Sequence, residues 1–557
     1  MTLGQPIGTT KGPGETPHEY IFVAPDPNQE LKYGEFVYHQ AQVDGQNRTI
    51  LARITKRVPI RLYPDSFLAD PTISPQSIAQ ALGLGDSSPE LFELTATILG
   101  YLDPILGFVN PRIPPPPGTP IYLAPDAMLQ KVLCQLGPEE NGAVHIGSLL
   151  SRPKGHVPIV LDARGFTSTH LAIIASTGAG KSYLAAVILE ELLRPYNRAA
   201  VMVIDPHAEY DSLAEMENHP AFTTQEYRPR VKIVRPQDIK VRVSSLTLGD
   251  LRYLLPDLSE KMHYVLGRAY RTVRSRYRER WTRHDLLVAI RASGQNQDEP
   301  ITDPSADEEL EEDPTIQALL WRVHSRLETT IFDDHQSLPL QELFRPGLCT
   351  VLQLNEIPER EQQIIVATLL RRLNQARMDT TRNRALPDDE NYLPYPVFVL
   401  IEEAHNYAPA GAEVATTQIL KQILSEGRKF GIAVGLISQR PGKLDADVLS
   451  QCMTQCIMRI VNPIDQSRVA ESVETVGRDL LKELPALSKG QAIIAGASIN
   501  TPVLVQVRQR FTPHGAENPD APGEWLAYFE KTNAERRQRD DAPPADHFPF
   551  GKSRLYK

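Results

Sequence analysis

The amino-acid sequence predicts an α/β protein whose mostly parallel sheet is covered by helices on both faces. From about residue 155 onward, fully apolar segments alternate with helical ones, as in parallel sheets buried on both sides. The segment 171–193 combines an apolar strand, a glycine-rich loop and a helix, which is the pattern of a phosphate-binding loop. Before this region, residues 19–60 have the pattern of short strands punctuated by glycine and proline, which indicates a small β-barrel.

The chain has 557 residues, enough for several domains. We expect the barrel domain to include helical segments at 74–83 and 89–100 and a stiff run of four prolines. The predicted divisions are a barrel domain at 1–150, an α/β core at 151–250 and 345–510, a helical insertion at 251–344, and a proline-rich, charged tail at 511–557.

Within the core, apolar runs mark the strands and longer patterned runs mark the helices. Helices are expected at 182–193, 360–377 and 416–430. Strands are expected at 171–175, 199–205, 231–236, 349–355, 396–403, 431–438, 456–462, 490–496 and 502–508.

Composition narrows the class of protein. Hydrophobic residues make up 41% and charged residues 23%, as in soluble globular proteins. The apolar runs are far shorter than a membrane span, and the N-terminus lacks the apolar core of a secretory signal, so we expect a cytoplasmic protein without membrane contact. The net charge of −10 argues against coating nucleic acid with the whole surface, but a local basic channel is compatible with it. Of the four cysteines, Cys452 and Cys456 are four apart, and buried thiols are favoured over a metal pair.

The insertion contains an arginine-rich helical segment, residues 267–284, with seven arginines. The residues Tyr270, Val273, Tyr277 and Trp281 fall on one helical face, and a neighbouring face carries Arg268, Arg271, Arg274 and Arg278. A surface or subunit-contact helix is favoured, and a DNA-contacting helix is the alternative. The acidic segment that follows, 295–314, has the composition of a mobile loop that could partly neutralise these arginines.

The loop between the strand at 171–175 and the next helix departs from G-x-x-x-x-G-K-[ST] at one position, where Ala175 replaces the first glycine. The loop binds phosphate through backbone N–H groups and the helix N-terminus, so its later positions matter most. An alanine costs little at residue 175 if its φ is negative. We therefore predict an intact nucleotide site formed by Thr177, Gly178, Ala179, Gly180, Lys181, Ser182 and Tyr183, with Lys181 reaching the β- and γ-phosphates and Ser182 binding Mg²⁺.

Two adjacent carboxylates, Glu402 and Glu403, follow a fully apolar strand. Buried charges are costly unless they are paired or bind a metal. We therefore expect Glu402 to hold Mg²⁺, directly or through water, and Glu403 to polarise the attacking water.

Polar residues near two other element ends complete the predicted site. Gln439 follows another core strand and could sense the γ-phosphate or orient water, and Arg440 is adjacent. Arg428 and Lys429 lie at a helix end. From there an arginine could reach a neighbouring subunit's nucleotide as a finger, but an ordinary cation at a helix C-terminus is an equally good interpretation.

Three stretches together carry a family resemblance: STGAGKS at 176–182, DPHAEY at 205–210 and IEEAHNYAP at 401–409. With a β-barrel in front, they resemble the HerA family of hexameric ATPases, within the HerA/FtsK branch of P-loop motors. The similarity extends to 344–354, 438–441 and 449–466 and covers most of residues 10–510.

The resemblance implies a HAS-type β-barrel, a RecA-like core and a homohexameric ring around double-stranded DNA. It also implies ATP and Mg²⁺ as cofactors, Glu403 as catalytic carboxylate and Gln439 as sensor. Arg428 becomes the favoured finger in trans, with Arg164 as a weaker candidate. The roles of Asp205, His207 and Glu209 stay open, and Ala208 replaces the commoner glycine, which we expect to be a small departure.

The implied activity is ATP-driven translocation or unwinding of DNA beside a partner, either a nuclease of the NurA type in end resection or another effector in antiphage defence. A second hypothesis is an assembly platform that uses ATP to hold and gate an effector nuclease or NADase without processive movement. A conjugation or secretion ATPase and a metabolic kinase fit less well.

Overall fold

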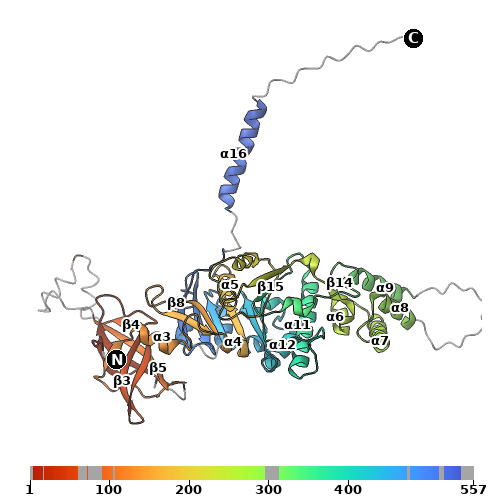
Figure 1. Ribbon diagram of the computed structural model, residues 1–557. Helices are drawn as coiled ribbons and strands as arrows, with labels where there is room; N and C mark the ends of the chain where they lie inside the picture. Colours follow the sequence, from red (N-terminus) through yellow and green to blue (C-terminus); the bar gives the residue numbers. More distant parts are fainter. Residues whose placement is uncertain are drawn as a thin grey trace, which may run out of the picture. The chain divides into compact units, whose positions relative to one another are not determined.

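The computed structural model of the chain describes residues 4–16, 18–60, 72, 91–103, 107–294, 313–472, 477–513 and 520–540. The helical segment expected at 74–83, most of the acidic segment and the last 17 residues lie outside the described residues. Figure 1 shows the N-terminal strands in red and orange and the helices of the insertion in green.

The N-terminal strands form the expected barrel. Six antiparallel strands follow each other in the order β2-β1-β7-β3-β4-β5, and pairing of β2 with β5 closes the ring. The inward residues, among them Tyr20, Phe22 and Leu94, form a separate hydrophobic core. The strands are β1 (Gly8–Pro13), β2 (Glu19–Pro25), β3 (Phe36–Val43), β4 (Gln46–Pro59), β5 (Leu91–Asp103) and β7 (Pro120–Leu123), with β6 (Gly107–Val109) paired to β5.

The helix expected at 89–100 is wrong, because residues from Leu91 onward form strand β5. Along this segment every second residue, from Phe92 to Ile98, is buried, and the residues between them are partly exposed. The period of two is that of a strand with one face in a core. The threonines between the apolar residues, which favour strands, are the sequence signal that the helical interpretation missed.

The large sheet has eleven strands in the order β12-β15-β11-β16-β17-β10-β18-β19-β20-β8-β9. The seven strands from β12 to β18 are parallel, and the last four are added antiparallel. The parallel strands are β10 (Leu171–Ile174), β11 (Val201–Asp205), β12 (Arg230–Val234), β15 (Leu348–Gln353), β16 (Val397–Ile401), β17 (Ile432–Ser438) and β18 (Thr454–Met458). The others are β8 (Ala143–Leu149), β9 (Pro158–Asp162), β19 (Gln491–Gly496) and β20 (Val503–Val507). Strand β8, within the range predicted for the first domain, thus belongs to the large sheet.

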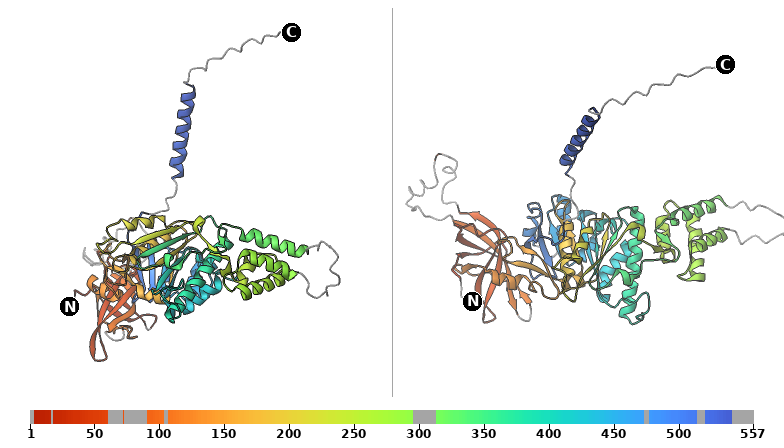
Figure 2. Two further views of the ribbon diagram at one scale, coloured as in Figure 1. Left: turned by 45° about the vertical axis from the view of Figure 1, so that its right-hand side comes forward. Right: turned by 45° about the horizontal axis from the view of Figure 1, so that its top comes forward.

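Both faces of this sheet are covered, as its apolar strands predict. Alternate residues of β10 enter two different cores, with Ile173 in one and Ile174 in the other. Helix α5 (Lys181–Leu192) packs in the core of Ile173, whereas α11 (Glu359–Thr381) and α12 (Thr417–Glu426) pack in the core of Ile174. The views in Figure 2 show these helices against the sheet.

The insertion is helical, as expected. Its helices are α6 (Leu248–Leu254), α7 (Glu260–Tyr277), α8 (Arg283–Gly294), α9 (Pro314–Leu327) and α10 (Leu340–Leu343), with a short strand pair of β13 (Val241–Arg242) and β14 (Phe332–Asp333) at its base. The remaining helices are α3 (Asp126–Leu133), α4 (Ala163–Thr169), α13 (Ala446–Ser450), α14 (Pro463–Ser472), α15 (Arg478–Leu481) and α16 (Ala521–Asp540). Short 3₁₀ turns η1 to η6 (Asp211–Glu217, Pro236–Asp238, Val243–Ser245, Ala404–Asn406, Gly427–Phe430 and Pro441–Lys443) complete the described structure.

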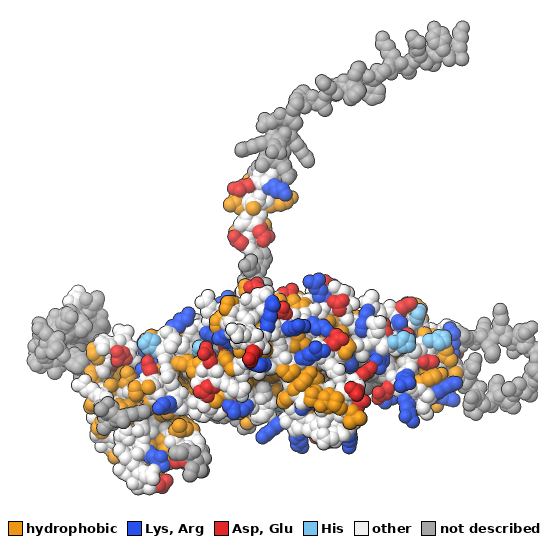
Figure 3. All heavy atoms as spheres, viewed as in Figure 1, with side chains coloured by type: hydrophobic (Ala, Val, Ile, Leu, Met, Phe, Trp, Pro, Cys, Tyr) orange, Lys and Arg blue, Asp and Glu red, His pale blue; other side chains and the backbone are white. Residues whose placement is uncertain are grey.

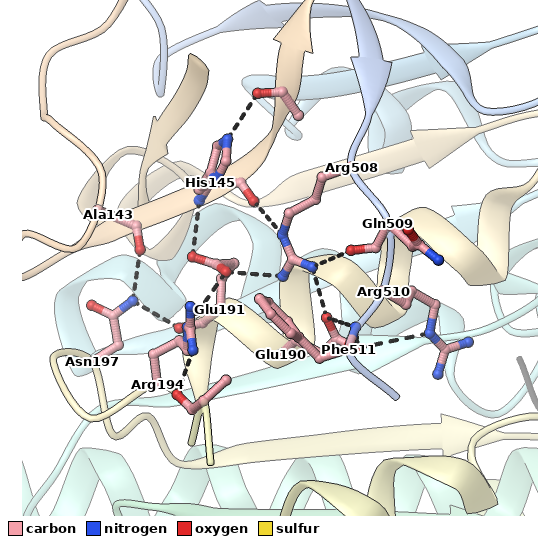
Figure 4. A network of polar contacts seen from close by, with 12 residues as sticks. Ala143, His145, Glu190, Glu191, Arg194, Asn197, Arg508, Gln509, Arg510 and Phe511 are labelled. Atoms are coloured by element: carbon pink, nitrogen blue, oxygen red, sulfur yellow. Dashed lines mark hydrogen bonds and ion pairs between the residues drawn. The ribbon is translucent and has the colours of Figure 1, made fainter. Parts of the chain in front are cut away.

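A buried network of ion pairs and hydrogen bonds joins the segment after β20 to helix α5 (Figure 4). Glu190 and Glu191, at the last turn of α5, are 0% and 1% exposed. The guanidinium of Arg508, which follows β20, donates to both carboxylates at 2.9 Å. Glu190 also accepts from the backbone N–H of Phe511 at 3.0 Å and of Thr512 at 2.9 Å. We call Arg508–Thr512 the C-terminal clamp, because these bonds hold the segment on the helix that begins with Lys181.

Helix α16 belongs to a separate C-terminal unit, residues 514–557. Its side chains Trp525, Tyr528 and Phe529 are exposed. Within the described part of the chain, no helix combines the length and apolar character that a membrane span requires. Cys452 and Cys456 are buried free thiols, as expected, and burial raises the pKa of Cys456 to about 12.

Candidate nucleotide-binding and catalytic site

Four neighbouring strands bring the predicted site residues to one edge of the sheet. Strands β11, β16, β17 and β10 are adjacent and parallel. Their carboxyl ends therefore meet at the edge where open α/β sheets bind ligands. The loop after β10 starts the glycine-rich segment, Glu402 and Glu403 follow β16, and Gln439 follows β17.

The loop has the backbone that its glycines predict. Gly178 and Gly180 have φ of +78° and +106°, a region that other residues rarely adopt. Ala175 is not among the residues with positive φ, so the methyl group at the first loop position costs no strain, as expected. Gly180 precedes the first residue of α5, so that backbone N–H groups at this helix start are free to bind an anion.

Lys181 and Ser182 lie directly against the acidic pair. The Nζ atom of Lys181 is 3.0 Å from Oε1 of Glu402 and 3.0 Å from Oε1 of Glu403. The hydroxyl of Ser182 lies 3.0 Å from the same oxygen of Glu402. Burial opposes the charged form of Lys181, but the two carboxylates outweigh it and raise its pKa above the ordinary value.

Glu402 is buried with spare capacity to bind a cation. Its side chain is 0% exposed, and burial raises its pKa to about 7. Its Oε2 atom has no hydrogen-bond partner. An unpartnered buried carboxylate oxygen beside a serine hydroxyl is a donor set that fits a hard cation such as Mg²⁺.

Sequence reasoning missed His405. Its Nδ1 atom lies 3.3 Å from Oε2 of Glu403 and 3.3 Å from the hydroxyl of Ser438, the last residue of β17. Burial lowers the pKa of His405, with Glu403 acting in the opposite direction. Nδ1 and the serine hydroxyl form a hydrogen bond whose direction depends on the tautomer of the ring, whereas Oε2 of Glu403 has no hydrogen-bond partner. The only sequence feature that points to His405 is its position two residues after Glu403.

The segment after β11 contributes a third carboxylate. Glu209, whose role the sequence left open, accepts from the hydroxyl of Ser182 at 2.6 Å. Asp205 accepts the backbone N–H groups of residues 207, 209 and 210 and so shapes this turn. Ala208 has a φ of +58°, which costs an alanine about 1–2 kcal/mol. The glycine commoner at this position would avoid that strain, whereas Ala175 is free of it.

Some of the remaining loop residues contact the site, and others contact neighbouring segments. The hydroxyl of Thr177 donates to Oε1 of Gln439 at 2.8 Å, which joins the loop to the end of β17. Ala179 accepts the backbone N–H of Gly490. The hydroxyl of Tyr183 accepts the backbone N–H of Arg510, so this side chain contacts the C-terminal clamp.

Arg428 does not join this cluster within its own chain. It is exposed in the turn that precedes β17, whereas Gln439 follows β17. A strand of seven residues separates them, a length of about 23 Å. Arg164, in helix α4 before β10, pairs with Asp162 at 3.1 Å.

The turn that carries Arg428 is held by a buried histidine. His170 is 2% exposed, and its Nδ1 atom accepts the N–H of Val434 at 3.1 Å while Nε2 lies 2.9 Å from the carbonyl oxygen of Leu424 in α12. Burial lowers the pKa of His170 from 6.5 to about 4.

This histidine predicts a loss of stability in acid. Between pH 6.5 and about 4 the unfolded chain binds a proton at His170 that the folded chain does not, so stability falls as pH drops through this window. Between pH 7 and pH 4, the free energy of unfolding should fall for the parent by on the order of 2–3 kcal/mol more than for the His170→Gln variant. Thermal unfolding across this range measures the effect. Replacement of the exposed His335 is the control, and an equal pH profile in parent and His170→Gln would refute the assignment.

Comparisons with known proteins agree with this geometry. The family model for the central domain of the helicase HerA matches residues 144–373. A probable helicase of Methanocaldococcus jannaschii, MJ1565, is 32% identical over 436 residues, which cover 77% of this chain and 78% of the relative. The DNA double-strand break repair helicase HerA of Pyrococcus furiosus is 30% identical over 459 residues, covering 76% of this chain and 79% of that protein. The chain belongs to the HerA helicase family.

Membership in the HerA family confirms the predicted enzyme class, an ATP-hydrolysing protein of the helicase or translocase type. Among solved structures, VirB4 of Thermoanaerobacter pseudethanolicus is 12% identical with a TM-score of 0.45, and the match covers 68% of this chain and 99% of that one. The family-model match ends before Glu402, Gln439 and Arg428, so the roles of these residues stay predictions.

Proposed function

We propose that six copies of this chain form a ring that moves along double-stranded DNA by hydrolysing ATP, beside a nuclease of the NurA type or a defence effector. The observation that carries the proposal is the pairing of Glu402 and Glu403 with Lys181 at the mouth of the glycine-rich loop. Relatives named as DNA double-strand break repair helicases support DNA as the substrate.

In this mechanism Lys181 exchanges its two carboxylate partners for the β- and γ-phosphates of ATP. Ser182 and Glu402 would hold Mg²⁺, which would neutralise charge on the phosphate oxygens. Loss of the lysine contact frees Oε1 of Glu403 to accept a proton from the attacking water, while Nδ1 of His405 lies 3.3 Å from the other oxygen. Gln439, already bonded to Thr177, is placed to respond to the γ-phosphate.

The position of Arg428 supports a ring. At the far end of β17 it is out of reach of the nucleotide bound by its own chain. In a ring, the same edge can face the site of the next subunit, where a guanidinium stabilises charge on the transferring phosphoryl group. Each site then needs residues from two copies.

Hydrolysis of ATP by the purified protein, with and without linear duplex DNA and at low and moderate salt, tests the proposal. We expect duplex DNA to raise the rate at least several-fold, and the stimulation to weaken with salt because phosphate contacts release counterions. Sedimentation should give a hexamer under the same conditions. A rate indifferent to DNA would refute the motor and favour the ATP-regulated platform.

A further inference from the structure

Helix α7 of the insertion presents an arginine stripe directly opposite its buried face. Residues Met262, Val265, Leu266, Ala269 and Val273 are buried against the other insertion helices. At 3.6 residues per turn, the positions of Arg268 and Arg274 fall within about 60° of Arg271. Arg278 directly follows the last residue of α7 and has a φ of +55°, so the helix predicted over 267–284 ends at Tyr277. The three arginines within the helix span about 9 Å of its axis. Figure 3 shows the blue side chains that gather on the insertion.

A fifth arginine joins the stripe from helix α6. Gly267 lies in the middle of the stripe, and a Cβ atom there would stand 3.4 Å from the guanidinium of Arg252 and 4.0 Å from that of Arg271. The missing side chain thus lets two like charges lie over the same turn of α7. Arg274 is oriented in addition by Tyr270, whose hydroxyl accepts from its guanidinium at 3.3 Å. We call Arg252, Arg268, Arg271, Arg274 and Arg278 the arginine surface.

Within the part of the chain that the structure describes, no carboxylate pairs with this surface. Among the described residues, none of the five arginines forms an ion pair with an aspartate or glutamate. Arginines three or four residues apart on a helix repel each other. Such a concentration of unpaired charge is unexpected in a chain whose net charge is −10. An anionic ligand with charges spread over the length of the stripe removes the repulsion.

We propose that the arginine surface binds the sugar-phosphate backbone of duplex DNA, as a contact separate from the ATP site. Guanidinium groups bind phosphate through paired N–H donors, and such contacts position a protein on DNA without reading its sequence. The exposed Tyr264, one turn before Arg268 on the same face, extends the surface with an aromatic ring. The inference rests on the proposed function, because it assumes that DNA is the substrate.

Binding of linear duplex DNA by the full-length protein, measured over a series of salt concentrations, tests the inference. The test variant carries Arg268→Gln, Arg271→Gln and Arg278→Gln. The matched control carries Arg276→Gln, Arg280→Gln and Arg291→Gln, which removes the same charge from exposed positions of the same insertion outside the stripe. If each stripe arginine contacts one phosphate, the slope of log affinity against log salt falls in magnitude by up to about 2.7 in the test variant. ATP hydrolysis without DNA stays at the parent level.

The measured slopes distinguish DNA binding by the arginine surface from DNA binding elsewhere on the protein. A slope reduced in the test variant but not in the control supports the arginine surface. Equal slopes in parent and test variant, or an equal reduction in test and control, overturn it and leave the motor in place; the stripe would then suit an acidic protein surface instead. Failure of the parent protein to bind duplex DNA at all overturns the proposed function together with this inference.

Discussion

The Glu403→Gln variant is expected to bind ATP and to hydrolyse it at least 100-fold more slowly than the parent. The amide keeps the size of the side chain and an oxygen for Lys181, but it cannot accept a proton from water. Removal of a general base costs a factor of roughly 10² to 10⁴ in rate. Release of phosphate under saturating ATP gives kcat, and titration with a fluorescent nucleotide gives the affinity, which should change less than about threefold.

Two further variants make this result specific. Replacement of the exposed Glu413 by glutamine, a carboxylate ten residues further along, should leave kcat unchanged. The His405→Asn variant should lower kcat but leave the KM for ATP close to the parent value, because His405 contacts Glu403 and not the loop. If Glu403→Gln keeps more than a tenth of the parent rate, the catalytic carboxylate is a different residue, and Glu402 becomes the first candidate.

The Arg508→Met variant is expected to lose roughly 3–5 kcal/mol of stability. Methionine leaves Glu190 and Glu191 without the guanidinium that bonds to both, and a buried charge without its partner is costly. The surrounding N–H donors of the clamp compensate only part of this cost. Thermal unfolding should shift downward by roughly 5–10 °C.

An exposed ion pair supplies the control for this prediction. Lys232 and Glu342 are 3.0 Å apart, with 39% and 56% of their side chains exposed, so Glu342→Gln should cost less than about 1 kcal/mol. A chain that ends at residue 513 keeps the clamp and should unfold near the parent temperature. A chain that ends at residue 507 should behave like Arg508→Met. Equal unfolding temperatures for both truncated chains would show that the clamp adds little.

Much of the fold follows from local patterns in the sequence. Apolar strands such as Val397–Ile401 carry few polar atoms, so they have to be buried on both faces, and the parallel sheet follows from that requirement. The four antiparallel strands at one end of the sheet could not be predicted in the same way. Strand β8 and strand β20 are more than 350 residues apart in sequence and contain no signal that specifies their pairing.

The site was predictable where backbone chemistry dictates residue type. Glycines at 178 and 180 have left-handed backbone conformations, and Lys181 and the acidic pair lie where the motif places them. The contacts of Glu209 and His405 were not predictable, because they depend on which strands become neighbours and on how two loops turn after leaving the sheet. The helix predicted at 89–100 is wrong for a different reason: Thr95 and Thr97 alternate with buried apolar residues, and this period of two favours a strand.

Strand β17 has a consequence for timing in a ring. Ser438 and Gln439 lie at one end, where Gln439 contacts the glycine-rich loop, and Arg428 precedes the other end. If Arg428 binds the nucleotide of the neighbouring copy, a small displacement of β17 moves Arg428 out of that neighbour's site. This displacement occurs when the chain that contains the strand changes the state of its own nucleotide site. Because the strand is rigid, Gln439 at one end and Arg428 at the other cannot move independently of each other. The subunits of the ring would then hydrolyse ATP one after another rather than all at once, because one strand connects two neighbouring sites.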